Sequence, residues 1–246
     1  MLVPTLSAGA KPRVIAGSAV SANVQSTVEP ATEPFAPIPV APETAVVTQT
    51  TIAATKGQRI AVYATATGTK PKWVLDNRTN FSGRHVFVVI GEEGSSYKVQ
   101  VPVRPNGSTG YVRVADVATY RHDFAIVVSL GEKRLTLYKG GVPVMRERVA
   151  VGKSGTPTPV GTFFLRELAR PPNPGGAYGP WAFGLSGYSN VLQTFGRGDG
   201  QIGLHGTNRP DQLGTQASHG CIRISNAAII KLAKTLPQGV PIDVRV

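Results

Sequence analysis

The residues with the clearest potential for chemistry lie in one short run, Ser218–Arg223, which reads Ser-His-Gly-Cys-Ile-Arg. It holds Cys221, the only cysteine in 246 residues, and another histidine, His205, lies sixteen positions upstream of that thiol. A thiol with an ordinary pKa of about 8.5 is mostly protonated at neutral pH and needs a base or a positive field to become a nucleophile. This combination of residue types predicts a cysteine nucleophile with an activating base.

The neighbours of Cys221 have candidate roles in such a site. His219 and Arg223 each lie two positions from the thiol, so in an extended segment all three side chains share one face. Gly220 permits a sharp turn whose backbone N–H groups could form an oxyanion hole. The guanidinium of Arg223 could bind a substrate carboxylate through two parallel hydrogen bonds.

Other interpretations of these residues remain open. Cys221 could be a buried, inert thiol, and Arg223 could belong to a surface ion pair. His205, His219 and Cys221 could bind zinc, but their spacing is not a common zinc pattern and no fourth ligand stands out in the sequence. We therefore expect no metal and no cofactor.

The charge of the chain narrows the possible partners. The net charge is +12, and residues 51–246 carry all of the positive excess. The basic residues are scattered and are not interleaved with aromatic residues, which disfavours a nucleic-acid partner. A solvated surface, or attraction to an anionic cell-wall polymer, accounts for this charge better. No stretch approaches the roughly 18 apolar residues of a transmembrane segment.

The first part of the chain divides into a tail and a small β unit. Residues 1–50 are rich in Pro, Ala and Thr and read as a disordered, extended spacer. Residues 1–10 end in Ala-Gly-Ala, the form of a signal cleavage site, but lack a basic start, so they are either a signal remnant or a chance match. Residues 51–120 show short apolar runs separated by turn residues, which predicts a small β-barrel.

Residues 122–246 predict a second β unit with a single helix. Ser225 is a good N-cap for this helix, and Pro237 ends it. The long polar loop of residues 170–180 is typical of a lid. The predicted strands are Phe124–Ser129, Arg134–Tyr138, Val142–Val151, Phe163–Leu165, Trp181–Leu185, Ile202–Leu204 and Val240–Val246.

Two patterns carry a family resemblance. His205-Gly206-Thr207 followed by Ser218–Arg223 resembles the YkuD-like L,D-transpeptidases over about residues 122–246. Gly155–Phe163 supports this, since it looks like the family segment Gly-x-x-x-Thr-Pro-x-Gly-x-Phe. Arg223 departs from the asparagine of the strict family pattern, and the spacer of residues 208–217 is short. In the preceding unit, the phrase Gly110–Val117 resembles the end of bacterial Src-homology-3-like domains.

The resemblance implies a mainly β protein, with a catalytic β-sandwich containing one helix, in the bacterial cell envelope. It implies that Cys221 attacks a peptidoglycan stem tetrapeptide, releases D-alanine and forms a thioester, which an amine of a second stem then resolves in cell-wall synthesis. His205 would be the base, oriented by the carbonyl of Gly206. Carbapenem-type β-lactams would be inhibitors.

The remaining site residues follow from the same resemblance. Ser218, His219 and Gly220 would shape the oxyanion and substrate site, Arg223 would contact substrate, and Tyr188 would line the acyl site. Hydrolysis of the thioester would instead give an L,D-carboxypeptidase, and transfer to a protein lysine would anchor a protein to the wall. A wall-binding protein with a degenerate site is the non-enzymatic alternative.

Overall fold

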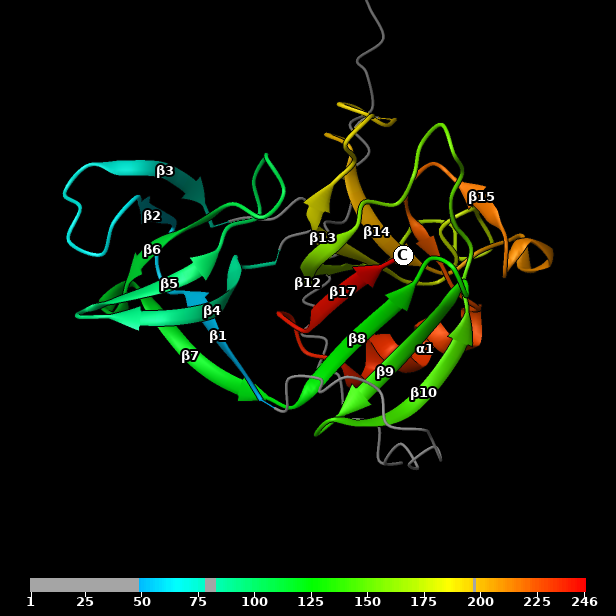
Figure 1. Cartoon of the computed structure of the whole chain (residues 1–246), viewed down its shortest axis with the longest axis horizontal. Helices are drawn as coiled ribbons and strands as arrows, with labels where there is room; N and C mark the ends of the chain where they lie inside the picture. The colour runs from blue at the N-terminus through cyan, green and yellow to red at the C-terminus, as the bar shows by residue number, and fades with distance from the viewer. Residues whose placement is uncertain (1–48, 78–82, 197) are drawn as a thin grey trace, which may run out of the picture.

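The computed structural model describes residues 49–77, 83–196 and 198–246 as two β units lying side by side (Figure 1). The predictions of a disordered tail over residues 1–50 and of a signal remnant over residues 1–10 lie outside these described residues, except at the tail's last two positions. The first strand already begins at Thr50.

The N-terminal unit is a seven-stranded antiparallel sheet with the strand order β3-β2-β6-β5-β4-β1-β7. Its inner face is lined by small and β-branched side chains around Phe87. The likeness of this unit to Src-homology-3-like domains stays a prediction. The strands are β1 (Thr50–Thr55), β2 (Arg59–Tyr63), β3 (Pro71–Asp76), β4 (Val86–Glu93), β5 (Ser96–Gln100), β6 (Thr109–Arg113) and β7 (Val117–His122).

Two of these strands, β3 and β7, carry weak sequence signals. β3 exposes alternate side chains at the edge of the sheet, and most of the residues of β7 are polar or small. Hydrogen bonding to neighbouring strands, rather than an apolar pattern, makes these segments extended. β5 ends at Gln100, because residues 101–108 turn back on themselves through a hydrogen bond from the Val101 N–H to the Ser108 carbonyl.

The C-terminal unit is an eight-stranded sheet with the order β10-β9-β8-β17-β12-β13-β14-β16, accompanied by a two-stranded sheet of β11 and β15. The predicted strands Phe124–Ser129, Arg134–Tyr138 and Val142–Val151 correspond to β8, β9 and β10, with β10 ending earlier, and they pair in sequence order as an antiparallel meander. The strands are β8 (Phe124–Ser129), β9 (Arg134–Lys139), β10 (Val142–Arg148), β11 (Val151–Gly152), β12 (Gly161–Ala169), β13 (Ala182–Tyr188), β14 (Gln201–His205), β15 (Gln216–Ser218), β16 (Ile222–Arg223) and β17 (Pro241–Arg245).

The large sheet folds over at β12, so that its two halves enclose one apolar core. Leu137 from one half and Leu204 from the other are fully buried in this core. Helix α1 (Asn226–Thr235) closes it by burying Ile229 and Leu232, and the Ser225 side chain caps the helix by accepting from the Ala228 N–H. The prediction of a mainly β protein with a sandwich and one helix in the C-terminal unit is confirmed for the described residues.

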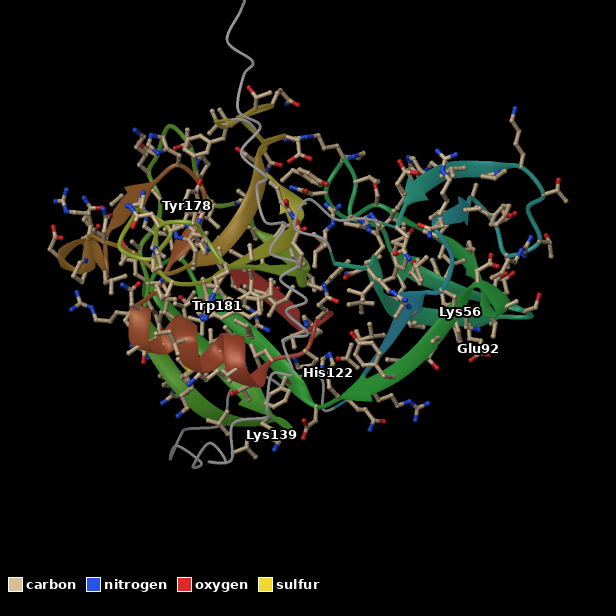
Figure 2. The ribbon with its side chains drawn as sticks, turned by 180° about the vertical axis from the view of Figure 1, so that it is seen from behind. Lys56, Glu92, His122, Lys139, Tyr178 and Trp181 are labelled. Atoms are coloured by element: carbon tan, nitrogen blue, oxygen red, sulfur yellow. The ribbon has the colours of Figure 1, made fainter. Side chains whose placement is uncertain are left out.

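The two units share a packed apolar boundary. Ile52 and Val86 of the first unit cluster with Phe164 of the second. The hydroxyl of Tyr120 donates to the carbonyl of Gln238 at 2.8 Å across the same boundary. His122 lies where the two units join (Figure 2). These contacts give the N-terminal unit a defined position beside the C-terminal one. In the described part of the chain no helix is long and apolar enough to cross a membrane.

Candidate active site

Cys221 and His205 meet because two adjacent strands deliver them. β14 ends at His205, and its parallel neighbour β16 begins directly after Cys221. The backbone N–H of Gly203 donates to Sγ of Cys221 at 3.3 Å. A Cβ atom at Gly203 would lie 3.6 Å from Cδ2 of His205 and 3.7 Å from Sγ of Cys221, so both side chains converge on one small volume.

His205 is held in one tautomer and in a nearly dry environment. Its Nδ1 lies 2.6 Å from the carbonyl oxygen of Gly206, and since a carbonyl only accepts, Nδ1 carries the proton and Nε2 keeps its lone pair. The side chain is buried at 4% exposure. Burial lowers the pKa of His205 to about 4; the charge of Arg223 also lowers it, and the hydrogen bond to Gly206 acts the other way.

The thiol is also favoured in its neutral form. Burial raises the pKa of Cys221 above its ordinary value, although the Gly203 N–H and the positive charge of Arg223 both oppose that rise. The resting site is therefore a neutral thiol beside a neutral imidazole. Among the described residues, no group of three His, Cys, Asp or Glu side chains is arranged to hold a metal ion.

Ser218 organises the turn that presents the thiol. Its hydroxyl donates to the carbonyl of Cys221 at 2.5 Å and accepts from the N–H of Gly220 at 3.0 Å. Gly220 has a φ of +117°, which favours glycine. Because the Gly220 N–H already donates to Ser218, it is not free to act as the expected oxyanion donor. Ser218 and Gly220 thus shape the site through the backbone.

The segment of residues 155–163 is hydrogen-bonded to the same turn. The buried hydroxyl of Thr158 donates to the carbonyl of Gly220 at 2.8 Å and accepts from the N–H of Gly152 at 2.9 Å. The N–H of Lys153 donates to the carbonyl of Ser218 at 3.1 Å. This explains why a pattern sixty residues away in sequence accompanies the cysteine.

Replacing Thr158 with valine should lower the free energy of unfolding by about 2 kcal/mol or more. Valine keeps the shape of threonine but leaves the buried N–H of Gly152 and the carbonyl of Gly220 without partners. Urea unfolding with an unchanged m-value would measure this loss. The control is Thr162→Val at an exposed position, where we expect a change within about 0.5 kcal/mol. Equal effects of the two substitutions would contradict the support given to Thr158.

Two cavities meet at the thiol. The first, of about 210 Å³, also contains Ser218, His219 and Arg223 in its wall, and the second, of about 380 Å³, extends past Arg170 and Pro171. A substrate can therefore approach Cys221 from two sides. The side chains that line both cavities are Tyr178, Phe195, Gln201, Ile202, His205 and Cys221.

His219 and Arg223 occupy the rim and wall of the first cavity. His219 is exposed, and its ring lies 5.4 Å from the ring of Phe195. Nη1 of Arg223 donates to Oε1 of Gln212 at 2.9 Å, which ties the wall to the short 208–217 spacer. Nε of Arg223 is buried and forms no hydrogen bond with the described residues. A cation thus lies beside the thiol with donor capacity to spare.

The expected lid contributes an aromatic cover. The ring of Tyr178, in the 170–180 loop, lies 4.7 Å from the ring of His205, and Figure 2 shows Tyr178 and Trp181 on the side of the unit that carries α1. Gly179 approaches Gly206 so closely that a Cβ atom would lie 2.7 Å from the Gly206 Cα atom. Oδ1 of Asn226, at the start of α1, accepts from the Thr207 N–H at 2.8 Å and would meet a Cβ at either glycine.

The structure does not bring Tyr188 to the site, although it was expected to line the acyl pocket. Tyr188 is buried and lines neither cavity. Its hydroxyl donates to the carbonyl of Pro102 in the N-terminal unit at 3.0 Å and accepts from Arg166 at 3.2 Å. Sequence reasoning instead missed Phe195 and the individual role of Tyr178, for which exposed aromatic residues in long loops were the available signal.

The sequence of the C-terminal unit is similar to known proteins. Residues 123–244 match the family model described as YkuD, the L,D-transpeptidase catalytic domain. YkuD of Bacillus licheniformis is 35% identical over 133 residues, which cover 54% of this chain and 70% of that protein. YkuD of Bacillus subtilis is 35% identical over 125 residues, which cover 51% of this chain and 68% of that protein.

Among solved structures, an L,D-transpeptidase from Mycobacterium tuberculosis is 15% identical, with a TM-score of 0.44 over 66% of this chain and 90% of that chain. The matches with the two YkuD proteins cover more than two thirds of the length of each of those proteins. The family match spans the unit that holds Cys221 and His205. The chain therefore belongs to the YkuD family of L,D-transpeptidase catalytic domains.

Proposed function

We propose that this protein cross-links peptidoglycan as an L,D-transpeptidase in which Cys221 is the nucleophile. The observation that carries the proposal is that Cys221 and His205 lie together where two cavities meet. The Gly206 carbonyl holds His205 in the tautomer whose Nε2 can accept a proton. One cavity suits an acyl-donor stem and the other an amine acceptor. The thioester needs no cofactor, because it conserves the energy of the peptide bond that it replaces.

The first half-reaction forms the thioester. Sγ of Cys221 attacks the carbonyl carbon of the third stem residue, while the thiol proton moves to Nε2 of His205. The C–N bond to the terminal D-alanine breaks, and the same proton passes to the leaving amine. Because both groups are neutral at rest, proton transfer accompanies attack instead of preceding it.

The second half-reaction mirrors the first. An amine of a second stem attacks the thioester carbonyl, His205 takes the amine proton, and the thiol of Cys221 recovers that proton as it leaves. Tyr178 covers His205 and limits the access of water to the acyl-enzyme. Water or a protein lysine as acceptor would turn the same intermediate toward hydrolysis or wall anchoring.

Two groups near the thiol fit the remaining tasks. The turn fixed by Ser218 leaves the Cys221 N–H as the oxyanion donor that we favour, since the N–H of Gly220 is already bonded. The guanidinium of Arg223, which lines the first cavity, suits a substrate carboxylate. His219 belongs to the wall in this assignment, because its ring faces Phe195.

This activity places the protein in the cell envelope, where its substrate lies. The net charge of +12 would favour residence near anionic wall polymers. Carbapenem-type β-lactams should acylate the same thiol.

The test is product analysis with a purified disaccharide-tetrapeptide. We expect release of D-alanine, a thioester on Cys221 by intact-protein mass spectrometry, and a cross-linked dimer when a second stem is present. A tripeptide without dimer would assign carboxypeptidase activity. Folded protein that releases no D-alanine and forms no adduct would overturn the proposal.

A further inference from the structure

The turn of residues 101–108 in the N-terminal unit lies against the loop that joins β13 to β14 in the C-terminal unit. We call residues 189–200, which the structure describes except for residue 197, the wall loop. It supplies Leu192, Phe195 and Gly200 to the first cavity, and Phe195 and Gly200 also line the second. The shape of both cavities thus depends on where this loop lies.

Arg104 of the N-terminal turn bonds to three carbonyl groups of the wall loop. Its Nη1 donates to the carbonyl of Ser189 at 2.7 Å. Its Nη2 donates to the carbonyls of Leu192 and Asp199 at 3.1 and 2.9 Å. The guanidinium lies 4.9 Å from the ring of Tyr188. One side chain therefore joins the start, middle and end of the loop.

Asn106 holds the residue that precedes the loop. Its Oδ1 accepts from the N–H of Tyr188 at 2.9 Å, and its Nδ2 donates to the carbonyl of the same residue at 2.7 Å. Nδ2 also lies 3.2 Å from Oδ1 of Asn190. The amide thus binds the backbone of Tyr188 on both sides, which fixes the point where the wall loop leaves β13.

The wall loop is adapted to the guanidinium. Gly200 has a φ of +78°, and a Cβ atom there would lie 2.8 Å from Nη2 of Arg104 and 2.3 Å from the Leu192 carbonyl oxygen. Only glycine allows the loop to close this tightly around the cation. The ring of Phe195 then rests 5.4 Å from that of His219, beside the nucleophile turn.

We propose that Arg104 is a positioning residue through which the N-terminal unit fixes the wall loop and so sets the affinity of the site for the stem peptide. This inference rests on the proposed function for its substrate, though not for the contact itself. Arg104 touches no reacting atom. The small β unit is accordingly part of the substrate-binding apparatus, and the C-terminal unit alone would bind stem peptide weakly.

The kinetic test compares Arg104→Ala and Arg104→Lys with wild type in the full chain, using disaccharide-tetrapeptide as donor. We expect KM to rise about tenfold or more in Arg104→Ala while kcat changes less than about threefold. The reason is that the wall loop contacts the bound peptide equally in the ground state and in the transition state. Arg104→Lys should be intermediate, since a compact ammonium cannot spread over three carbonyls as a planar guanidinium does.

The matched control is Arg113→Ala. Arg113 also donates to backbone carbonyls, those of Ala66 and Gly68, and lies 4.5 Å from the ring of Tyr63, all within the N-terminal unit. Its loss should lower the stability of that unit and leave KM unchanged. An equal rise of KM in Arg113→Ala and Arg104→Ala would overturn the proposal, because destabilisation of the unit would then explain both.

Hydrogen exchange gives a readout that needs no turnover. Amides of the wall loop should exchange faster in Arg104→Ala and not in Arg113→Ala, while alkylation of Cys221 by iodoacetamide keeps its wild-type rate in both. Unchanged exchange in the loop, or an unchanged KM, would contradict the positioning role. If wild type turned over no stem peptide, the proposed function would fail, and unchanged loop exchange would still independently overturn the role of Arg104.

Discussion

Replacing Cys221 with serine should reduce the rate of acylation by a carbapenem by about 10³-fold or more. A serine hydroxyl is a much weaker acid than a thiol, and the neutral His205 that faces it is a weak base because burial lowers its pKa to about 4. Proton transfer would then be too unfavourable to produce an oxygen nucleophile. Stopped-flow fluorescence measures the rate, and intact-protein mass spectrometry identifies the adduct.

The same substitution should leave the fold intact. The described structure gives Sγ a single hydrogen bond, at 3.3 Å from the N–H of Gly203, and a hydroxyl can accept that bond as well. We therefore expect the circular dichroism spectrum of Cys221→Ser to match wild type and its Tm to lie within a few degrees. An adduct that forms at the wild-type rate in this variant would place the reactive group elsewhere in the chain.

The parts of the site that follow one another in sequence could be predicted from it. Residues Ser218–Arg223 carry their spacing with them, and His205 precedes a run that the family pattern identifies. The N-cap at Ser225 and the strand Phe124–Ser129 also agree with the structure, because capping and continuous apolar runs are local signals. Local patterns therefore predicted the residues that meet at the candidate site and part of the frame that holds them.

The contacts between distant segments could not be predicted in this way. Tyr188 ends a strand that is close to the site in sequence. Its hydroxyl bonds to Pro102 and its backbone to Asn106, and the positions of these two residues depend on how the two units pack. The bonds of Ser218 to Gly220 and of Thr158 to Gly220 likewise depend on the folded turn. A single sequence does not show which backbone group a hydroxyl will hydrogen-bond in the folded protein.

The arrangement of glycines links the fold to the chemistry. Gly179 and Gly206 lie where a Cβ atom would collide with Asn226, and a Cβ at Gly179 would also collide with the backbone of Gly206. Because neither residue has a side chain, the 170–180 loop can pack directly against the end of β14 beside His205. The dry surroundings that lower the pKa of this histidine are a consequence of that close approach.

Replacing His205 with glutamine should lower the acylation rate at pH 7 by about 10²- to 10⁴-fold, since the variant lacks a general base. Because burial raises the pKa of Cys221, we expect partial recovery only at alkaline pH, where the thiol ionises without help. In wild type, neutral His205 is available throughout pH 5.5–8, so the rate should be nearly flat there and fall as pH approaches 4. Rates of carbapenem acylation across this range measure both profiles.

Stability has to be followed at each pH, because buried histidines also couple protonation to unfolding. His85, in the N-terminal unit, has its pKa lowered to about 4 by burial and by the nearby Arg166. For His85 and His205 the pKa in the folded state lies below that in the unfolded state. Between pH 6.5 and 4 the unfolded state therefore binds more protons, and the free energy of unfolding decreases as the pH decreases. His85→Gln is therefore the matched control. This variant should lose less stability than wild type as the pH decreases, and its acylation rate should show the wild-type pH profile. A wild-type acylation rate that titrates near pH 6.5 would contradict a resting pair of neutral thiol and neutral imidazole.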